Sequence, residues 1–434
     1  MSGPKTLLRG GCVLTLDRTN FAEADVLIDS DTIVEVGPGL RARDAEVIDA
    51  TDTIVMPGFV DSHRHVSESL LRNFGGSSSA RGDRPPYQPE DVYAATLIGL
   101  LGALEAGITT VVDWSEIGPG DGSLEAVIQA HAGSGIRSVL AAATPRSING
   151  SEQWRASLAR AKATTIESPL LTLAAGAPSP MQGELDQVAM DWAFAREHGL
   201  RIHAHVGTDP NTQGLIGDLA DRALLGSDVT LVQCTHLSDS DFDAVFSSGA
   251  SVSLTPSSGM SSGTGSPPIQ SLLDRGLRPG LGVGSEQMSP GDMFAQMRAV
   301  ISIQHATLFD LKLAGRAGVP ALLNTREVIR FATVDGARAA GLGKTVGALA
   351  PGAKADLIML RTDRPNVFPI NDPIGAVVWG MDTSNVDWVF VAGRAVLRNG
   401  VLEADVARAR ELATTAQRHV ARAGGLLAEA GESR

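Results

Sequence analysis

Two histidines one residue apart, His63 and His65, are the residues of this sequence best suited to metal chemistry. They close an apolar run that extends from Ile54 through Val60 and predicts one buried strand. Side chains on a strand alternate between faces, so both imidazoles point one way while Arg64 faces elsewhere. Imidazole nitrogen binds zinc and similar ions well. The pair predicts a divalent metal site at a strand end, although two polar residues that cap a strand remain an alternative.

The elements that must position these histidines alternate between apolar strands and helical patterns, which predicts β/α units and a parallel sheet. Eight such units favour a (β/α)8 TIM-like barrel over an open doubly wound sheet, and no glycine-rich phosphate loop follows the first strand. Functional residues should then lie where strands end. The seven strands predicted after the first span 109–113, 136–142, 170–174, 201–206, 229–234, 250–254 and 277–283.

Two β-rich segments bracket this α/β region and are expected to pair into one small composite β-sandwich domain. The predicted boundaries place this domain at 1–54 and 346–402, the catalytic barrel at 55–345, and a C-terminal helix and tail at 403–434.

The composition of the chain limits the classes of partner that we expect it to bind. Its 434 residues carry a net charge of −13 and no run of lysine or arginine, which argues against nucleic acid or an anionic membrane as the main partner. Two cysteines give no disulfide framework and fit a reducing compartment. No signal peptide or apolar stretch long enough to cross a bilayer is expected, so we predict a cytoplasmic protein.

The stretch from Pro57 to His65 resembles the first barrel strand of the amidohydrolase superfamily, most closely its cytosine-deaminase and triazine-chlorohydrolase branch. The phrase Gly352-Ala353-Lys354-Ala355-Asp356-Leu357 also matches this family, and the resemblance covers nearly the whole chain. It implies a metal-dependent hydrolase of a carbon–nitrogen bond in a small molecule, such as a cyclic amide, an amidine or a deaminase-type substrate. It also implies one divalent metal, zinc or alternatively iron, and a homodimer.

By this resemblance His205 is the third metal ligand beside His63 and His65. Three imidazoles would leave an open position for water, whose pKa such a metal lowers to ~7. His203 shares a strand face with His205 but lies one layer deeper, so we expect it to be a core histidine.

The resemblance fails at three positions. Thr208 replaces a glutamate that shuttles protons in the deaminase branch, Gln233 replaces a histidine, and Gly284 replaces the aspartate that binds metal and takes the proton from water. The residues predicted to act at the site in their place are Glu286, Glu116 and His236, together with Gln233 and Thr208 themselves.

These departures leave three hypotheses open. The first is a hydrolase that has recruited a new acid–base group. The second is an enzyme of another class, such as a lyase, isomerase or cyclase, which needs no activated water and could work without metal. The third is a catalytically impaired homologue that binds a ligand or a partner. Loss of general acid–base catalysis alone removes roughly 10²–10⁴-fold in rate.

Overall fold

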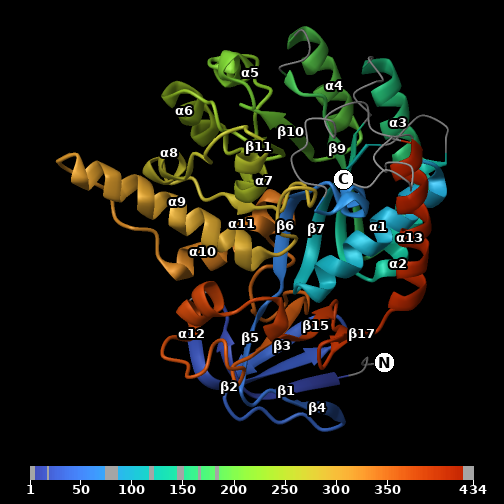
Figure 1. Ribbon diagram of the computed structural model, residues 1–434, viewed down its shortest axis with the longest axis vertical. Helices are drawn as coiled ribbons and strands as arrows, with labels where there is room; N and C mark the ends of the chain where they lie inside the picture. Colours follow the sequence, from blue (N-terminus) through green and yellow to red (C-terminus); the bar gives the residue numbers. More distant parts are fainter. Residues whose placement is uncertain are drawn as a thin grey trace, which may run out of the picture.

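The computed structural model describes residues 5–16, 19–73, 87–116, 122–143, 151–164, 168–180 and 185–423. Two sheets organise these residues: a parallel barrel and, below it in Figure 1, a mixed sheet built from both ends of the chain. The predicted fold class, a (β/α)8 barrel with a small β domain, is confirmed by this arrangement.

The barrel contains eight strands paired in chain order, each parallel to the next. It closes where a parallel bridge joins Arg64 to Gly284, and the amide of His65 donates to the Gly284 carbonyl at 2.9 Å. The strands are β6 (Phe59–Arg64), β7 (Ile108–Glu116), β8 (Arg137–Ala143), β9 (Leu171–Gly176), β10 (Ile202–Val206), β11 (Val229–Gln233), β12 (Ser251–Leu254) and β13 (Gly280–Leu281).

Helices follow the strands on the outside of the barrel (Figure 1). Apolar side chains on their inner faces join the barrel strands in one large buried cluster. The helices are α1 (Pro89–Glu105), α2 (Ser123–Ser134), α3 (Ser151–Thr164), α4 (Leu185–Glu197), α5 (Leu215–Asp221), α6 (Asp239–Ser248), α7 (Pro256–Ser261), α8 (Ile269–Asp274), α9 (Met293–Leu313), α10 (Thr325–Phe331), α11 (Val334–Ala339) and α13 (Val406–Ala423), with a 3-10 turn η1 (Val66–Leu71) after β6.

The mixed sheet joins the two ends of the chain, because β14 pairs antiparallel with β5 in its middle. Its order is β17-β16-β15-β14-β5-β1-β2-β3, and β4 pairs with β1 off this path. The strands are β1 (Lys5–Leu14), β2 (Asn20–Asp29), β3 (Thr32–Gly37), β4 (Ala45–Asp49), β5 (Thr53–Pro57), β14 (Leu357–Arg361), β15 (Val386–Val391), β16 (Arg394–Arg398) and β17 (Val401–Leu402).

The single strand predicted from Ile54 to the histidines is two strands in two sheets. β5 belongs to the mixed sheet, β6 begins the barrel, and Gly58 lies between them. A Cβ at Gly58 would lie 2.2 Å from the side chain of Thr109, so the chain passes β7 at a distance that only glycine allows. The apolar run in the sequence indicates that both strands are buried. It does not indicate that the chain passes from one sheet to the other between them.

A buried ion pair connects the barrel to the mixed sheet. Arg137 begins β8, and its Nε and Nη2 atoms lie 2.6 and 3.0 Å from the two carboxylate oxygens of Asp356, which precedes β14. The same carboxylate accepts the amide of Ala392 at 2.8 Å. Both charged side chains are almost fully buried. This buried ion pair therefore connects the two sheets.

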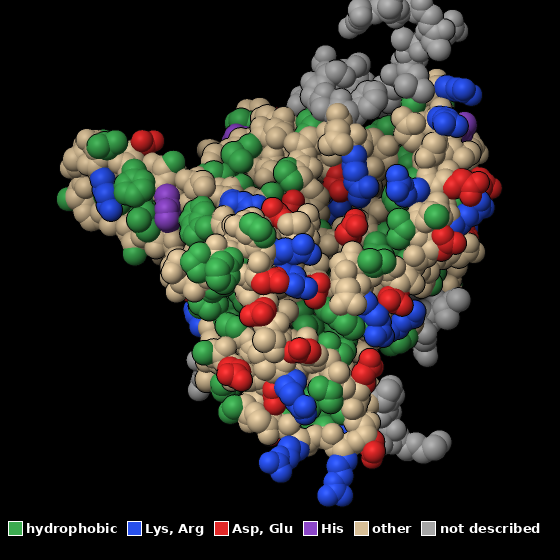
Figure 2. Space-filling model, turned by 60° about the horizontal axis from the view of Figure 1, so that its bottom comes forward, with side chains coloured by type: hydrophobic (Ala, Val, Ile, Leu, Met, Phe, Trp, Pro, Cys, Tyr) green, Lys and Arg blue, Asp and Glu red, His purple; other side chains and the backbone are tan. Residues whose placement is uncertain are grey.

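The far half of α9 projects from the body of the molecule as an arm (Figure 1). It carries exposed apolar side chains, among them Phe309 and Leu313, the latter 86 % exposed. Figure 2 shows hydrophobic side chains gathered along this projection. Among the described residues, no helix is both long enough and apolar enough to span a membrane.

Candidate metal centre

A β-bulge lies near the end of β6, the strand that carries His63 and directly precedes His65. Between Asp61 and Arg64 the strand advances three residues, while its partner β7 advances only two, from Val111 to Asp113. The extra residue changes the alternation of faces, as bulges commonly do near sites. His63 and His65 lie on either side of Arg64 and reach one place, with their ring centroids 5.0 Å apart.

His205, from β10, joins this pair. Its Nε2 lies 3.1 Å from the Nε2 of His63, and its ring centroid lies 5.8 Å from that of His65. One ligand atom from each of the three imidazoles lies within 4.8 Å of the others. Among the described residues this is the only group of three or more histidine, cysteine or acidic side chains with that geometry.

The three imidazoles fit a divalent ion. Nitrogens bound to one zinc at 2.0–2.1 Å lie roughly 3.3 Å apart at a tetrahedral angle, close to the observed His63–His205 spacing of 3.1 Å. The buried Nδ1 atoms of His63 and His65 have no hydrogen-bond partner within the described part of the chain. Burial, and then the neighbouring His205, keep the pKa of His63 well below its usual range, so this ring stays neutral as a ligand must.

Trp114 covers one side of the histidines. Its ring centroid lies 4.4 Å from that of His205 and 5.8 Å from that of His63. The side chain belongs to β7 and packs with Val112 and Val139 against the barrel interior. Sequence reasoning placed Glu116 at this strand end and missed Trp114, two residues before it. The available signal was that Trp114 falls on the same strand face as the apolar Val112.

His203 lies deeper in the barrel, fully buried. Burial first, and then Arg201, lower its pKa to about 3. Neither ring nitrogen has a hydrogen-bond partner within the described residues, so it is a buried histidine without the hydrogen bonds typical of that role.

Gly284, at the position where the family resemblance expects an aspartate, closes the barrel beside the histidines. Its backbone has φ +70°, and its amide donates to the His63 carbonyl at 3.0 Å. A Cβ at this position would lie 2.8 Å from the Cβ of Ser258 and 3.1 Å from the Cβ of Thr255. Side chains of α7 and of the residue before it therefore occupy the space that a larger residue would need.

Glu286, predicted as a recruited acid–base group, is held in an ion-pair network. Its carboxylate lies 2.8 Å from Nη2 of the buried Arg64 and 2.9 Å from Nε of Arg72, and the Ser69 hydroxyl donates to it. Burial raises the pKa of Glu286, but Arg64 and Arg72 outweigh it and lower that pKa to about 2. Arg64 also pairs with Asp61 at 3.3 Å. The network holds Arg64, the last residue of β6, and sequence reasoning did not identify it.

Glu116 and His236 also remain outside the cluster of ligand atoms formed by the described histidines. Glu116 ends β7 in a half-buried position, and the Nε2 of His236 lies 2.6 Å from the Thr264 carbonyl oxygen. Thr208 is exposed just beyond β10. The structure thus brings together the three predicted ligands and leaves Glu116 and His236 outside their cluster of ligand atoms.

Gln233 ends β11 in a strained backbone conformation. It has φ +81° and Cys234 follows with φ +58°, a region that residues other than glycine seldom adopt. The Oε1 atom of Gln233 faces α7, 3.1 Å from the place of a Cβ on Gly259. Strain of this kind is common at functional sites.

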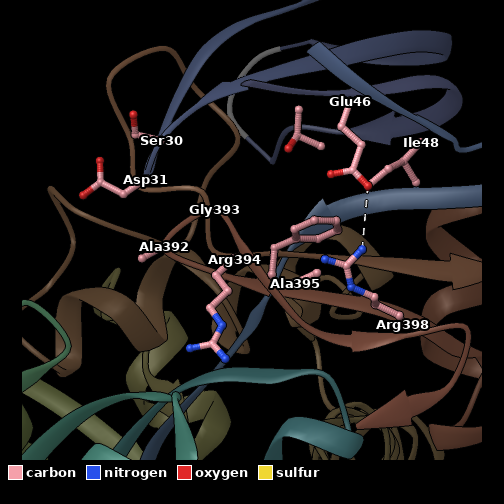
Figure 3. Close-up of a pocket in the computed structure, with 11 residues that line it drawn as sticks. Ser30, Asp31, Glu46, Ile48, Ala392, Gly393, Arg394, Ala395 and Arg398 are labelled. Atoms are coloured by element: carbon pink, nitrogen blue, oxygen red, sulfur yellow. Dashed lines mark ion pairs between the residues drawn. The ribbon is translucent and has the colours of Figure 1, made fainter. Parts of the chain in front are cut away.

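A separate cavity of about 410 Å³ lies in the small β domain (Figure 3). No histidine lines it. Two ion pairs involve residues that line it: Arg398 lies 3.7 Å from Glu46, and Asp31 lies 2.5 Å from Lys354. It is therefore no rival to the histidines as a metal site.

Comparison with known proteins places this geometry in a family. The model of the amidohydrolase family matches residues 54–396. A 5-methylthioadenosine/S-adenosylhomocysteine deaminase of Pelotomaculum thermopropionicum is 28% identical over 90% of this chain and 93% of its own length. A 5'-deoxyadenosine deaminase of Methanothermobacter thermautotrophicus is 28% identical over 89% of this chain and 92% of its own.

Solved structures share the fold. An adenosine deaminase from Xanthomonas campestris with bound zinc superposes with a TM-score of 0.81 at 19% identity, covering 97% of this chain and 99% of its own. A zinc complex of atrazine chlorohydrolase from Arthrobacter aurescens gives 0.82 at 22% identity, covering 95% and 100%. The predicted hydrolase of a carbon–nitrogen bond in a small molecule, other than a peptide bond, is confirmed by the family and its named relatives. The chain belongs to the amidohydrolase family.

Proposed function

We propose that this protein is a zinc-dependent deaminase-type hydrolase that releases ammonia from a small heterocyclic amine. The observation that carries the proposal is the convergence of His63, His65 and His205 from two strands, with one ligand atom each within 4.8 Å. The names of the relatives, which are deaminases of adenosine-like compounds, support the substrate class.

In this proposal the histidines, Trp114 and the Arg64–Glu286 pair have different roles. His63, His65 and His205 would hold the ion, and a zinc ion at such a site polarises the substrate and activates water. Trp114, in edge contact with two of the rings, limits access of bulk water from its side. Arg64 and Glu286 fix the strand that carries two ligands, so Glu286 serves as a positioning residue.

The direct test is an ammonia-release assay on zinc-loaded protein. 5'-Methylthioadenosine, S-adenosylhomocysteine and 5'-deoxyadenosine are the first substrates, and His205→Ala is the control that removes one ligand. We expect turnover by the wild type and none above background by the variant. Equal rates for both proteins would contradict the proposal.

We further propose a cytoplasmic homodimer that joins through the α9 arm and binds no nucleic acid. Support comes from the exposed Phe309 and Leu313 on the projecting arm, the two free cysteines and the net charge of −13. Light scattering checks the dimer: Leu313→Asp should give monomers, whereas Val401→Asp, at another exposed apolar residue, should leave the mass unchanged. A monomeric wild type would overturn the arm assignment.

A further inference from the structure

A buried serine, histidine and aspartate form a hydrogen-bonded chain next to β6. The Oγ of Ser138, on β8, lies 2.7 Å from Nδ1 of His131, on α2. Nε2 of the same histidine lies 3.0 Å from Oδ2 of Asp113, on β7. All three residues are at most 3 % exposed. A nucleophilic serine must reach its substrate, so this chain of residues is not a second catalytic site.

One arrangement of protons satisfies every member of this chain of hydrogen bonds. The Ser138 hydroxyl donates to Nδ1 of His131, and the Nε2–H of that ring donates to Oδ2 of Asp113. The other carboxylate oxygen, Oδ1, accepts the backbone amide of Val66 at 3.1 Å. Buried polar networks that are fully satisfied are rigid. The Asp113 carboxylate is therefore fixed by α2 and β8, and it fixes the Val66 amide in turn.

Val66 directly follows the candidate ligand His65, and hydrogen bonds hold the peptide groups on both sides of that histidine. The His65 amide donates to the Gly284 carbonyl at 2.9 Å, and the Val66 amide donates to Asp113. His65 has φ −92° and ψ 82°, values of neither a helix nor a strand. Since two peptide planes set the direction of the Cα–Cβ bond between them, these two contacts aim the His65 side chain.

The His65 imidazole depends on this support from the backbone. A ligand histidine is commonly oriented by a hydrogen bond to its second ring nitrogen. Within the described part of the chain, the buried Nδ1 atom of His65 has no such partner. The peptide groups on either side of it are therefore the contacts best placed to orient the ring.

We propose that Asp113, held by His131 and Ser138, positions the metal ligand His65 by fixing the peptide group that follows it. None of the three belongs to the cluster of ligand atoms, so they are positioning residues. Their role depends on hydrogen bonds and not on the charge of the carboxylate. The inference rests on the proposed function, because it requires that the imidazoles hold an ion.

The test is the affinity of chelator-treated full-length protein for Co²⁺, measured by competition with a chelator, together with the visible spectrum of the Co²⁺ protein. Asp113→Ala removes the acceptor of the Val66 amide and should weaken Co²⁺ binding by about 10–100-fold, the usual effect of losing a residue that orients a ligand. Asp113→Asn should keep the wild-type affinity and spectrum. Its amide oxygen accepts the Val66 amide, and its NH₂ group donates to His131 in the other tautomer.

Asp25→Ala is the matched control. Asp25, on β2 of the mixed sheet, is also buried and accepts two backbone amides, that of Gly10 at 2.9 Å and that of Leu40 at 2.8 Å. Its removal should lower the free energy of unfolding and leave Co²⁺ affinity unchanged. An equal loss of affinity in Asp113→Ala and Asp25→Ala would show a general loosening of the fold and overturn the inference.

The remaining outcomes also decide. Wild-type affinity and spectrum in folded Asp113→Ala would overturn this inference alone, and so would an Asp113→Asn variant as weak as Asp113→Ala. No Co²⁺ binding by the wild type would overturn the proposed function with it. If Asp113→Ala failed to fold, His131→Phe, which takes away the donor to Asp113, should weaken Co²⁺ binding, and His131→Gln, whose amide donates to that carboxylate, should restore it. Equal affinities of His131→Phe and the wild type would then overturn the inference.

Discussion

At the scale of single residues, the side chains that surround the histidine ligands could be found only in three dimensions. The spacing of His63 and His65 was visible in the sequence, as was the pair that contains His205. Trp114 and the Glu286–Arg64 pair were not, because an aromatic ring in an apolar strand and an acid in a loop have no distinctive spacing. Their roles depend on contacts between residues distant in sequence.

Thr208 offers a residue-scale prediction about chemistry. It is exposed just beyond His205, at the position where the resemblance expects a proton-shuttling glutamate. We expect Thr208→Glu to raise ammonia release by about 10²-fold, the low end of what a positioned acid–base group contributes. Thr208→Gln is the matched control without a titratable group. Equal turnover by the two variants would count against a deaminase.

Glu286→Gln should act on stability. It leaves Arg64 without its closest partner, so the free energy of unfolding should fall by about 3–5 kcal/mol, as for other broken buried pairs. Because the pKa of Glu286 is lowered to about 2, its contribution is complete above the ordinary carboxyl pKa and is lost as pH falls through about 2. Urea titrations at pH 7 and at pH 3 should therefore show a larger difference at pH 7.

The control for this change is Glu411→Gln on α13. Glu411 lies 2.6 Å from Arg408, and both side chains are more than half exposed. An exposed pair is worth about 0–1 kcal/mol. A loss at Glu286 as small as that at Glu411 would contradict the role of the buried network.

At the scale of elements, the strands were predictable and their exact ends were not. Apolar runs identified the barrel strands, since buried parallel strands are apolar along their whole length. The bulge in β6 and the close approach of Gly58 to Thr109 both depend on how β6 is paired with β7. No local sequence pattern encodes this pairing. The barrel closes at the seam between β13 and β6, where Arg64 bridges to Gly284. The geometry of the histidines depends most on this seam.

This seam gives an element-scale prediction that uses two glycines with equal backbone angles. Gly284 and Gly318 both have φ +70°, but a Cβ at Gly318 meets nothing within 4 Å. Gly284→Ala and Gly318→Ala share the cost of the left-handed backbone, and only the first adds crowding. Denaturant unfolding should show an extra loss of about 1–3 kcal/mol for Gly284→Ala. Equal losses would mean that Ser258 yields freely and that position 284 is not closed.

At the scale of the whole molecule, the alternation of strands and helices and the two β-rich ends were enough to predict a barrel with a composite β domain. The contact that joins the two sheets could not be predicted, because Arg137 and Asp356 are 219 positions apart. Arg137→Met should lower the free energy of unfolding by about 3–5 kcal/mol, since it strands a buried carboxylate. Arg160→Met, in a half-exposed pair with Glu125, should cost about 0–1 kcal/mol in the same chemical denaturation.

The central claim is that three imidazoles from two strands bind one divalent ion, and X-ray absorption at the zinc edge tests it most directly. Protein loaded with one equivalent of zinc should show three imidazole ligands with nitrogens at about 2.0–2.1 Å, and His205→Ala should show two. A wild-type spectrum with fewer than three imidazoles, or protein that retains no zinc after gel filtration, would contradict the account.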